Sequence, residues 1–171
     1  MGYQIKIFQA TKDDAGDIAN IQTEAWVCAY PNSGLGITKE DIVLKTEEFN
    51  KQGLGRIINE ISKENSKTWV AKSGDQVVGF IGVSEDGEIG RIEALHVLPN
   101  FQGQGIGTKL LNTALDYLEG SKKIAIEVVS YNKKAIKFYE SFGFENTKKI
   151  AEDKIILPSG HLIEKVLLIK E

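Results

Sequence analysis

The 171-residue chain contains a single cysteine, Cys28, which excludes an internal disulfide and fits a reducing compartment. We interpret Cys28 as a buried structural thiol rather than an acyl-carrying nucleophile, because its neighbours on a predicted helix are apolar and no histidine stands in a recognisable relation to it. Histidine is almost as scarce, with two residues in the whole chain. No set of side chains has the spacing of a metal site, and we expect no bound metal.

Positive charge is not in excess either. The formal net charge is −3, so the composition gives no electrostatic case for binding nucleic acid or an anionic membrane, although it is compatible with a cationic substrate. No apolar run is long enough to cross a bilayer, and residues 1–10 lack the apolar core of a signal peptide. We therefore expect a cytoplasmic protein, a monomer or homodimer, with residues 1–171 forming one domain.

The order of predicted elements indicates an α/β protein. Alternating and β-branched residues predict strands, and apolar residues at helical spacing predict helices. The predicted strands are residues 4–8, 68–72, 77–84, 88–98, 124–129, 144–150 and 161–169, and the predicted helices are residues 11–31, 38–64 (broken near 53–55), 110–118 and 132–142. Strands and helices in this order predict a mixed sheet with helices packed on it.

The most informative segment is a glycine-dense loop between the predicted strand at 88–98 and the predicted helix at 110–118. It consists of Gln102, Gly103, Gln104, Gly105, Ile106, Gly107 and Thr108. Unpaired backbone N–H groups at a helix start, together with the positive end of the helix dipole, favour an anion. Glycine also lets a phosphate approach the backbone. The loop therefore predicts a phosphate-bearing cofactor.

The spacing of this loop excludes two common phosphate-binding motifs. A dinucleotide fingerprint needs glycine where Thr108 stands, and a nucleoside-triphosphate loop needs lysine before the threonine, whereas Thr108 precedes Lys109. The remaining pattern, Gln-x-x-Gly-x-Gly, resembles the pyrophosphate loop of the GNAT superfamily of acyl-CoA N-acyltransferases. Gln102 stands where that pattern often has arginine, which removes one charge from the loop.

A second segment resembles the same superfamily. The predicted strand at 124–129 is followed by Asn132, Ala135, Tyr139, Gly143 and Phe144, in the spacing Asn-x-x-Ala-x-x-x-Tyr-x-x-x-Gly-Phe that follows the fifth strand of GNAT enzymes. Asn132 is a good helix N-cap, and Gly143 suits the end of that helix. Two motifs in the right order make the resemblance specific over residues 69–144.

The resemblance implies a fold and a cofactor. The fold would be a mixed, mostly antiparallel sheet of about seven strands with helices on both faces, in which strands four and five splay apart. Acetyl-CoA would lie in that wedge, with its pantetheine arm along the fourth strand and its pyrophosphate on the glycine loop. Besides the loop, the residues expected to hold it are Leu95, His96, Val97, Asn132, Ala135, Phe138 and Tyr139.

The resemblance also implies transfer to an amine, and because Cys28 has no recognisable base we expect this transfer to be direct, without an acyl-enzyme. Tyr139 would donate a proton or a hydrogen bond to the departing thiolate. The amine must first lose a proton, and the candidate bases are Glu93, our choice, with His96, Glu127 and ordered water as alternatives. Alternation places Glu93 and His96 on opposite faces of their strand unless a bulge intervenes, so we expect only one of them to face the cleft.

Trp26 and Tyr30 fall where GNAT enzymes place the wall of the acceptor site. They would bind an amine by cation–π contacts or belong to the core. Residues 25–41 and 164–165 loosely resemble PaiA-type polyamine acetyltransferases, which suggests a spermidine-like small-molecule acceptor. The alternatives are a protein or peptide N-acetyltransferase, a non-catalytic acyl-CoA-binding module and an unrelated nucleotide-binding domain.

Overall fold

The computed structural model describes residues 4–171. Its strands are β1 (Ile5–Gln9), β2 (Ser66–Ser73), β3 (Gln76–Asp86), β4 (Ile89–Val97), β5 (Lys123–Val129), β6 (Glu145–Ile150), β7 (Ile155–Ile156), β8 (Leu162–Ile163) and β9 (Lys165–Lys170). Its α-helices are α1 (Ala15–Ala29), α2 (Lys39–Lys51), α3 (Gly55–Ser62), α4 (Ile106–Tyr117) and α5 (Lys133–Glu140). Short 3₁₀ turns precede α1, α2 and α4: η1 (Lys12–Asp14), η2 (Ser33–Leu35) and η3 (Pro99–Phe101).

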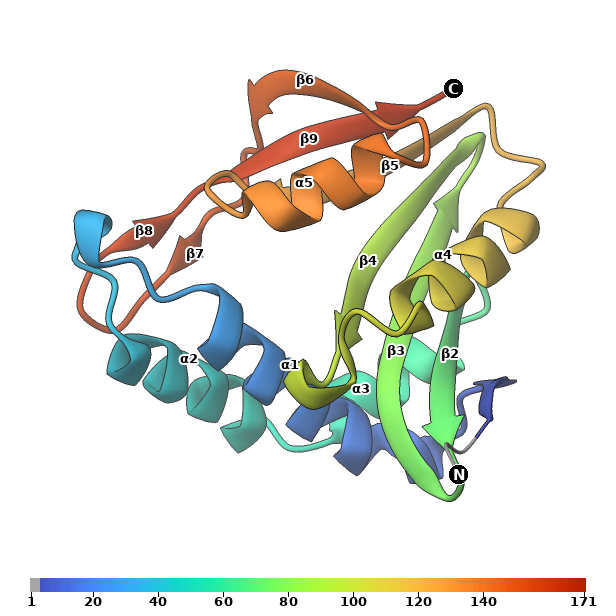
Figure 1. The fold of residues 1–171 in the computed structure, drawn as a ribbon, viewed down its shortest axis with the longest axis horizontal. Helices are drawn as coiled ribbons and strands as arrows, with labels where there is room; N and C mark the ends of the chain where they lie inside the picture. The colour runs from blue at the N-terminus through green and yellow to red at the C-terminus, as the bar shows by residue number, and fades with distance from the viewer. Residues whose placement is uncertain (1–3) are drawn as a thin grey trace.

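Seven of the strands form one sheet, in the order β1-β2-β3-β4-β5-β9-β6 (Figure 1). The central pair, β4 and β5, is parallel, and the other neighbours are antiparallel. The predicted mixed, mostly antiparallel sheet is therefore confirmed. Strands β7 and β8 form a separate two-stranded ribbon, which lies beyond the N-terminal end of β9, on the left in Figure 1.

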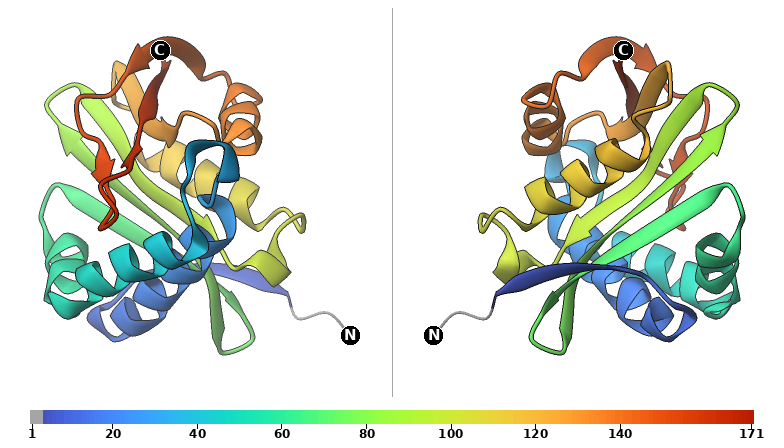
Figure 2. Two further views of the ribbon diagram at one scale, coloured as in Figure 1. Left: turned by 90° about the vertical axis from the view of Figure 1, so that its left-hand side faces the viewer. Right: turned by 90° about the vertical axis from the view of Figure 1, so that its right-hand side faces the viewer.

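Helices cover both faces of the sheet, as predicted (Figures 1 and 2). Successive residues of a strand point to opposite faces, and β2 shows this at Val70 and Ala71. Val70 packs with Ile18 of α1, whereas Ala71 belongs to the cluster that contains Leu110 of α4 and Tyr139 of α5. Because both faces of β3 are buried over residues 77–81, this segment of the strand is a continuous run without polar side chains.

Local sequence signals explain where the helices begin and end. Thr38 and Asp41 form a reciprocal capping box at the start of α2, with each side chain accepting the other's backbone N–H at 3.1 Å. At the start of α5, the side chain of Asn132 accepts the N–H of Ala135 at 3.1 Å. Gly143 follows α5 with a φ of +84°, a left-handed conformation that favours glycine.

Two expectations about this fold are wrong. Residues 161–169 do not form one strand, because β5 ends at Val129 and offers no partner beyond Lys165. The preceding residues therefore pair with β7 instead. Cys28 is exposed rather than buried. Helix α1 buries Trp26, and two further residues rotate the chain by about 200°, which turns Cys28 to the opposite face.

Candidate active site

The site lies in a wedge between β4 and β5. These strands pair only where residues 89–92 face residues 123–126, and beyond Ile92 they separate (Figure 1). The splaying expected of strands four and five is therefore present. The wedge opens into a cavity of about 770 Å³, lined from one side by β4, α1 and the glycine loop and from the other by β5, α5 and β9.

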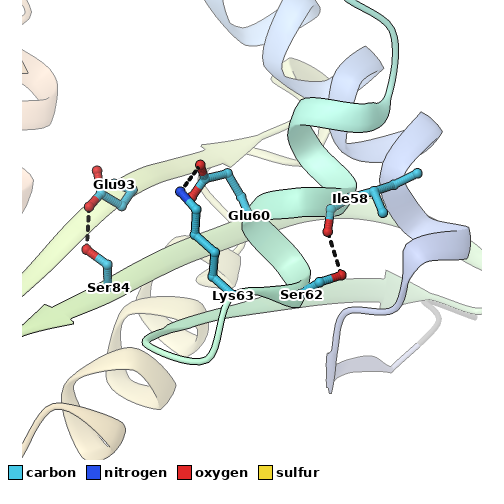
Figure 3. Close-up of polar contacts among 6 residues, drawn as sticks. All are labelled: Ile58, Glu60, Ser62, Lys63, Ser84 and Glu93. Carbon is cyan, nitrogen blue, oxygen red and sulfur yellow. Dashed lines mark hydrogen bonds and ion pairs between the residues drawn. The ribbon is translucent and has the colours of Figure 1, made fainter.

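A β-bulge in β4 shapes one wall of this cavity. Gly82 of β3 faces Ala94, but the next residue, Val83, faces Ile92, so Glu93 is an extra residue without a partner. A bulge interrupts the alternation of side chains. Glu93 and His96 both line the cavity, as do all residues from 91 to 97, so the exception that we allowed for a bulge applies and neither candidate base is excluded. The Glu93 carboxylate accepts a hydrogen bond from the Ser84 hydroxyl on β3 (Figure 3).

The glycine loop leads directly into α4. Gly103 and Gly105 have φ values of +76° and +77°, a left-handed backbone conformation that favours glycine. Apart from the adjacent residues of the chain, no atom lies within 4 Å of the position that a Cβ would take at either glycine. Gly105 is the N-cap of α4, so the N–H groups of the first turn have no partner within the helix, and Gly105, Ile106 and Gly107 line the cavity. Of the predicted loop residues, Gln104 alone does not line the cavity; its side chain instead donates to the carbonyl of Asn100 at 3.3 Å.

The backbone of β4 is available along the wedge. Leu98 donates its N–H to Val78 of β3 at 2.9 Å, so the backbone groups of the preceding Val97 face the opposite side, toward the wedge. The Val97 carbonyl there accepts a hydrogen bond from Nε2 of Gln102 at 3.1 Å. By the same alternation Leu95 also presents its backbone to the wedge, which is the geometry expected for a strand-like ligand.

Tyr139 lies on the α5 side of the cavity, with 5% of its surface exposed. Its ring packs edge-on against Phe138 and Phe144, with centroid distances of 5.2 and 5.7 Å. The hydroxyl has no hydrogen-bond partner within residues 4–171, yet no buried side-chain oxygen there is left unpaired, so the hydroxyl opens onto the cavity. Burial raises the pKa of the Tyr139 phenol, and the neighbouring Tyr30 adds to the rise. The side chain therefore stays protonated and can donate.

Trp26 and His96 meet at the other side of the cavity. The indole N–H of Trp26 donates to Nε2 of His96 at 3.3 Å, and the imidazole packs against Phe80 with ring centroids 5.6 Å apart. Burial lowers the pKa of the His96 imidazole to about 4, so the ring is neutral at pH 7. Trp26 belongs to the core and also lines the cavity, as does the half-buried Tyr30; that these residues bind an amine stays a prediction.

The remaining charged groups of the cavity stand at positions that neither motif specifies. Glu127 of β5 forms an ion pair with Lys165 of β9. Arg91, Lys134 and Asp153 also line the cavity. Within residues 4–171 no three His, Cys, Asp or Glu side chains are grouped to hold a metal ion, and no helix there has the length and apolar character needed to cross a bilayer.

Comparison with known proteins agrees with this geometry. A model of the acetyltransferase (GNAT) family matches residues 20–144, and an uncharacterized N-acetyltransferase of Archaeoglobus fulgidus is 31% identical over 146 residues, covering 80% of this chain and 90% of that protein. The chain belongs to the GNAT family. Membership of this family supports the conclusion that the protein is an acetyl-CoA-dependent N-acetyltransferase, as the two motifs predict.

Solved GNAT structures share the whole fold. The PaiA N-acetyltransferase of Thermoplasma acidophilum, solved in complex with coenzyme A, superposes with a TM-score of 0.80 at 19% identity, covering 98% of this chain and 99% of that one. A variant of the spermidine N-acetyltransferase SpeG of Vibrio cholerae superposes with a TM-score of 0.66 at 19% identity, covering 98% and 93%. At these identities the likeness establishes the fold alone.

Sequence reasoning missed several residues of this GNAT site. Lys134 occupies an unspecified position of the second motif, so no pattern marks it. Asp153 lies between β6 and β7, where no periodicity indicates an element. Lys165 reaches the cavity only because β9 pairs with β5, and that neighbour relation is not visible in the spacing of residues.

Proposed function

We propose that this enzyme transfers the acetyl group of acetyl-CoA directly to a primary amine of a small cationic molecule such as spermidine. The observation that carries the proposal is one cavity that contains the glycine loop, the Tyr139 hydroxyl, the Glu93 carboxylate and the aromatic wall of Trp26 and Tyr30. A donor site, an acid, a base and an acceptor wall in one cavity are the components that such a transfer requires.

Two parts of the cavity suit two parts of the cofactor. Open space above Gly103 and Gly105 accommodates a diphosphate at the N-terminus of α4, and the wedge-facing backbone of Leu95 and Val97 suits the amides of a pantetheine arm. When bound, the cofactor supplies an acetyl thioester. Asn132 holds the start of α5 in place, which fixes Tyr139 on the wall beside that arm.

Glu93 is the base that the contacts favour. Glu127 is neutralised by Lys165, and Nε2 of His96 is already occupied by the Trp26 indole. The Glu93 carboxylate accepts one hydrogen bond, from the neutral hydroxyl of Ser84. Its remaining lone pairs can take a proton from the ammonium group of the acceptor, either directly or through water. The freed nitrogen forms the new C–N bond as the C–S bond breaks, and the Tyr139 hydroxyl donates to the leaving sulfur.

The electrostatics of the acceptor side support a cationic substrate. Away from the glycine loop, the cavity is lined by the carboxylates of Glu93, Glu127 and Asp153, against the two cations Arg91 and Lys165. Trp26 and Tyr30 add aromatic faces that attract an ammonium group. A linear polyamine offers one amine for acetylation and further ammonium groups for these partners.

A thiol-release assay with acetyl-CoA tests the proposal. Spermidine, spermine and putrescine are compared with free amino acids and with peptides that carry a free N-terminus. We expect the highest kcat/KM with a polyamine, and a large loss of that value in Glu93→Gln. Higher kcat/KM with peptides would instead identify a peptide N-acetyltransferase, and binding of coenzyme A without release from any amine would identify a non-catalytic module.

A further inference from the structure

The side chain at the first position of the glycine loop is held by the protein itself. Nε2 of Gln102 donates to the Val97 carbonyl at 3.1 Å, and Oε1 accepts from the Lys134 ammonium at 3.0 Å. Gln102 thus links the end of β4 to the start of α5 across the wedge. Its amide carries no charge and already has a partner at each end, so it is a poor direct substitute for a cationic phosphate ligand.

Lys134 supplies the charge that the loop lacks. Three cationic side chains line the cavity among the described residues: Arg91, Lys134 and Lys165. Lys165 pairs with Glu127, and Arg91 lies where β4 still pairs with β5, at the narrow end of the wedge. Lys134 alone is in contact with the glycine loop, and its contact there is a neutral amide oxygen.

The ammonium group has the capacity for a second partner. It carries three N–H donors, of which Gln102 takes one, and the side chain is exposed at the cavity rim. An anion on the N–H groups of Gly105 and Gly107 would lie next to α5, because the ring of Phe138, one turn after Lys134 on that helix, lies 3.6 Å from the position that a Cβ would take at Gly107. A charged acceptor forms a stronger hydrogen bond with an ammonium group than an amide oxygen does.

We propose that Lys134 is the cationic ligand of the cofactor's diphosphate and that Gln102 is the positioning residue that holds its ammonium at the loop beforehand. The proposal rests on the use of acetyl-CoA and is independent of which amine accepts the acetyl group. In this arrangement the missing arginine of the loop is replaced by a lysine from the facing helix.

Calorimetric titration with three probes tests this assignment: coenzyme A, 3′-dephospho-coenzyme A and acetyl-pantetheine, which lacks the diphosphate. We expect Lys134→Gln to bind the first two about tenfold more weakly than wild type and acetyl-pantetheine equally well. Lys134→Arg should restore most of the affinity. Lys133→Gln is the matched control, because Lys133 is the adjacent exposed lysine of α5 and does not line the cavity.

Each contrary outcome has a distinct meaning. Unchanged affinity of Lys134→Gln for coenzyme A would overturn the assignment, as would a loss that disappears with 3′-dephospho-coenzyme A, since Lys134 would then contact the 3′-phosphate. An equal loss in Lys133→Gln would reduce the effect to general electrostatics and overturn it too. Failure of the wild-type chain to bind coenzyme A at all would overturn the cofactor site itself.

Discussion

Replacing Tyr139 with phenylalanine removes one hydroxyl and keeps the ring that packs against Phe138 and Phe144. The hydroxyl makes no hydrogen bond within residues 4–171 and opens onto the cavity, so its loss leaves no buried group unpaired. We therefore expect the free energy of unfolding to change by less than about 0.5 kcal/mol, and coenzyme A to bind with near wild-type affinity.

The chemical step should respond strongly. Burial raises the pKa of Tyr139, so the phenol is a weak acid that contributes mainly by donating a hydrogen bond to the developing thiolate. A hydrogen bond to a charged group is worth about 1.5–3 kcal/mol, which corresponds to a rate lower by about 10- to 150-fold. Because the pKa is raised, the donor also stays protonated in alkaline solution, and its ionisation should not lower kcat between pH 8 and 10.

Single-turnover thiol release, started by mixing the enzyme–acetyl-CoA complex with saturating amine, measures this step. The matched control is Tyr117→Phe, because Tyr117 packs on Trp69 and does not line the cavity. The control should keep the wild-type rate. If Tyr139→Phe also keeps it when chemistry limits turnover, or if both variants slow equally, Tyr139 is a packing residue and the thiolate leaves without its help.

Three further predictions follow from the cavity and its surroundings. Gly107→Ala should raise the free energy of unfolding, measured with urea, by up to about 1 kcal/mol, because alanine has the higher helix propensity. The same variant should bind coenzyme A more weakly in calorimetry, because the added methyl group would lie in the wedge, 3.6 Å from the Phe138 ring. Tighter binding of coenzyme A would contradict this prediction. The pKa of His96 is about 4 in the folded protein and about 6.5 in the unfolded chain, so the free energy of unfolding should fall by up to about 3 kcal/mol as the pH decreases from 6.5 to 4. His96→Gln should lose less stability over this range in urea unfolding. Equal pH slopes for the two proteins would show that the His96 imidazole is not buried in its neutral form. Cys28→Ser should keep its rate, since the exposed thiol does not line the cavity, and acetylated Cys28 in mass spectra would overturn direct transfer.

The sequence predicts the fold of this chain well because its signals are local. Glycine, N-caps and apolar periodicity are properties of short segments, and they place α2 and α5 correctly, whereas α4 begins at Ile106, before the predicted start at residue 110. The two motifs carry information on the tertiary fold as well, because a known family links them to a wedge between two strands. For that reason the loop residues and Tyr139 are predicted to lie near one cavity, and all of them except Gln104 line it.

The sequence does not show which distant segments are in contact. The bulge at Glu93 depends on its register with β3, and nothing in residues 88–98 alone reveals an extra residue. Similarly, the partners of Gln102 and Glu127 are lysines 32 and 38 residues away. Such pairs decide which carboxylate is free to act as a base, so the candidate bases could be named from sequence but not ranked.

The short pairing of β4 with β5 also bears on how the molecule unfolds locally. Only four residues of each strand, 89–92 and 123–126, join the β1–β4 part of the sheet to the β5–β9–β6 part. Few backbone hydrogen bonds therefore cross this boundary, whereas one apolar cluster, which contains Val83 of β3 and Val128 of β5, spans it. Regions joined by few hydrogen bonds can open as separate cooperative units, at a free energy below that of global unfolding. Amide hydrogens of β5, β9 and β6 should therefore exchange together, and faster than those of β2 and β3. A cofactor that contacts β4 and α5 at once would bind only the form in which the two parts of the sheet are joined, and would therefore slow this exchange. The slowing would grow with the ratio of the cofactor concentration to its dissociation constant.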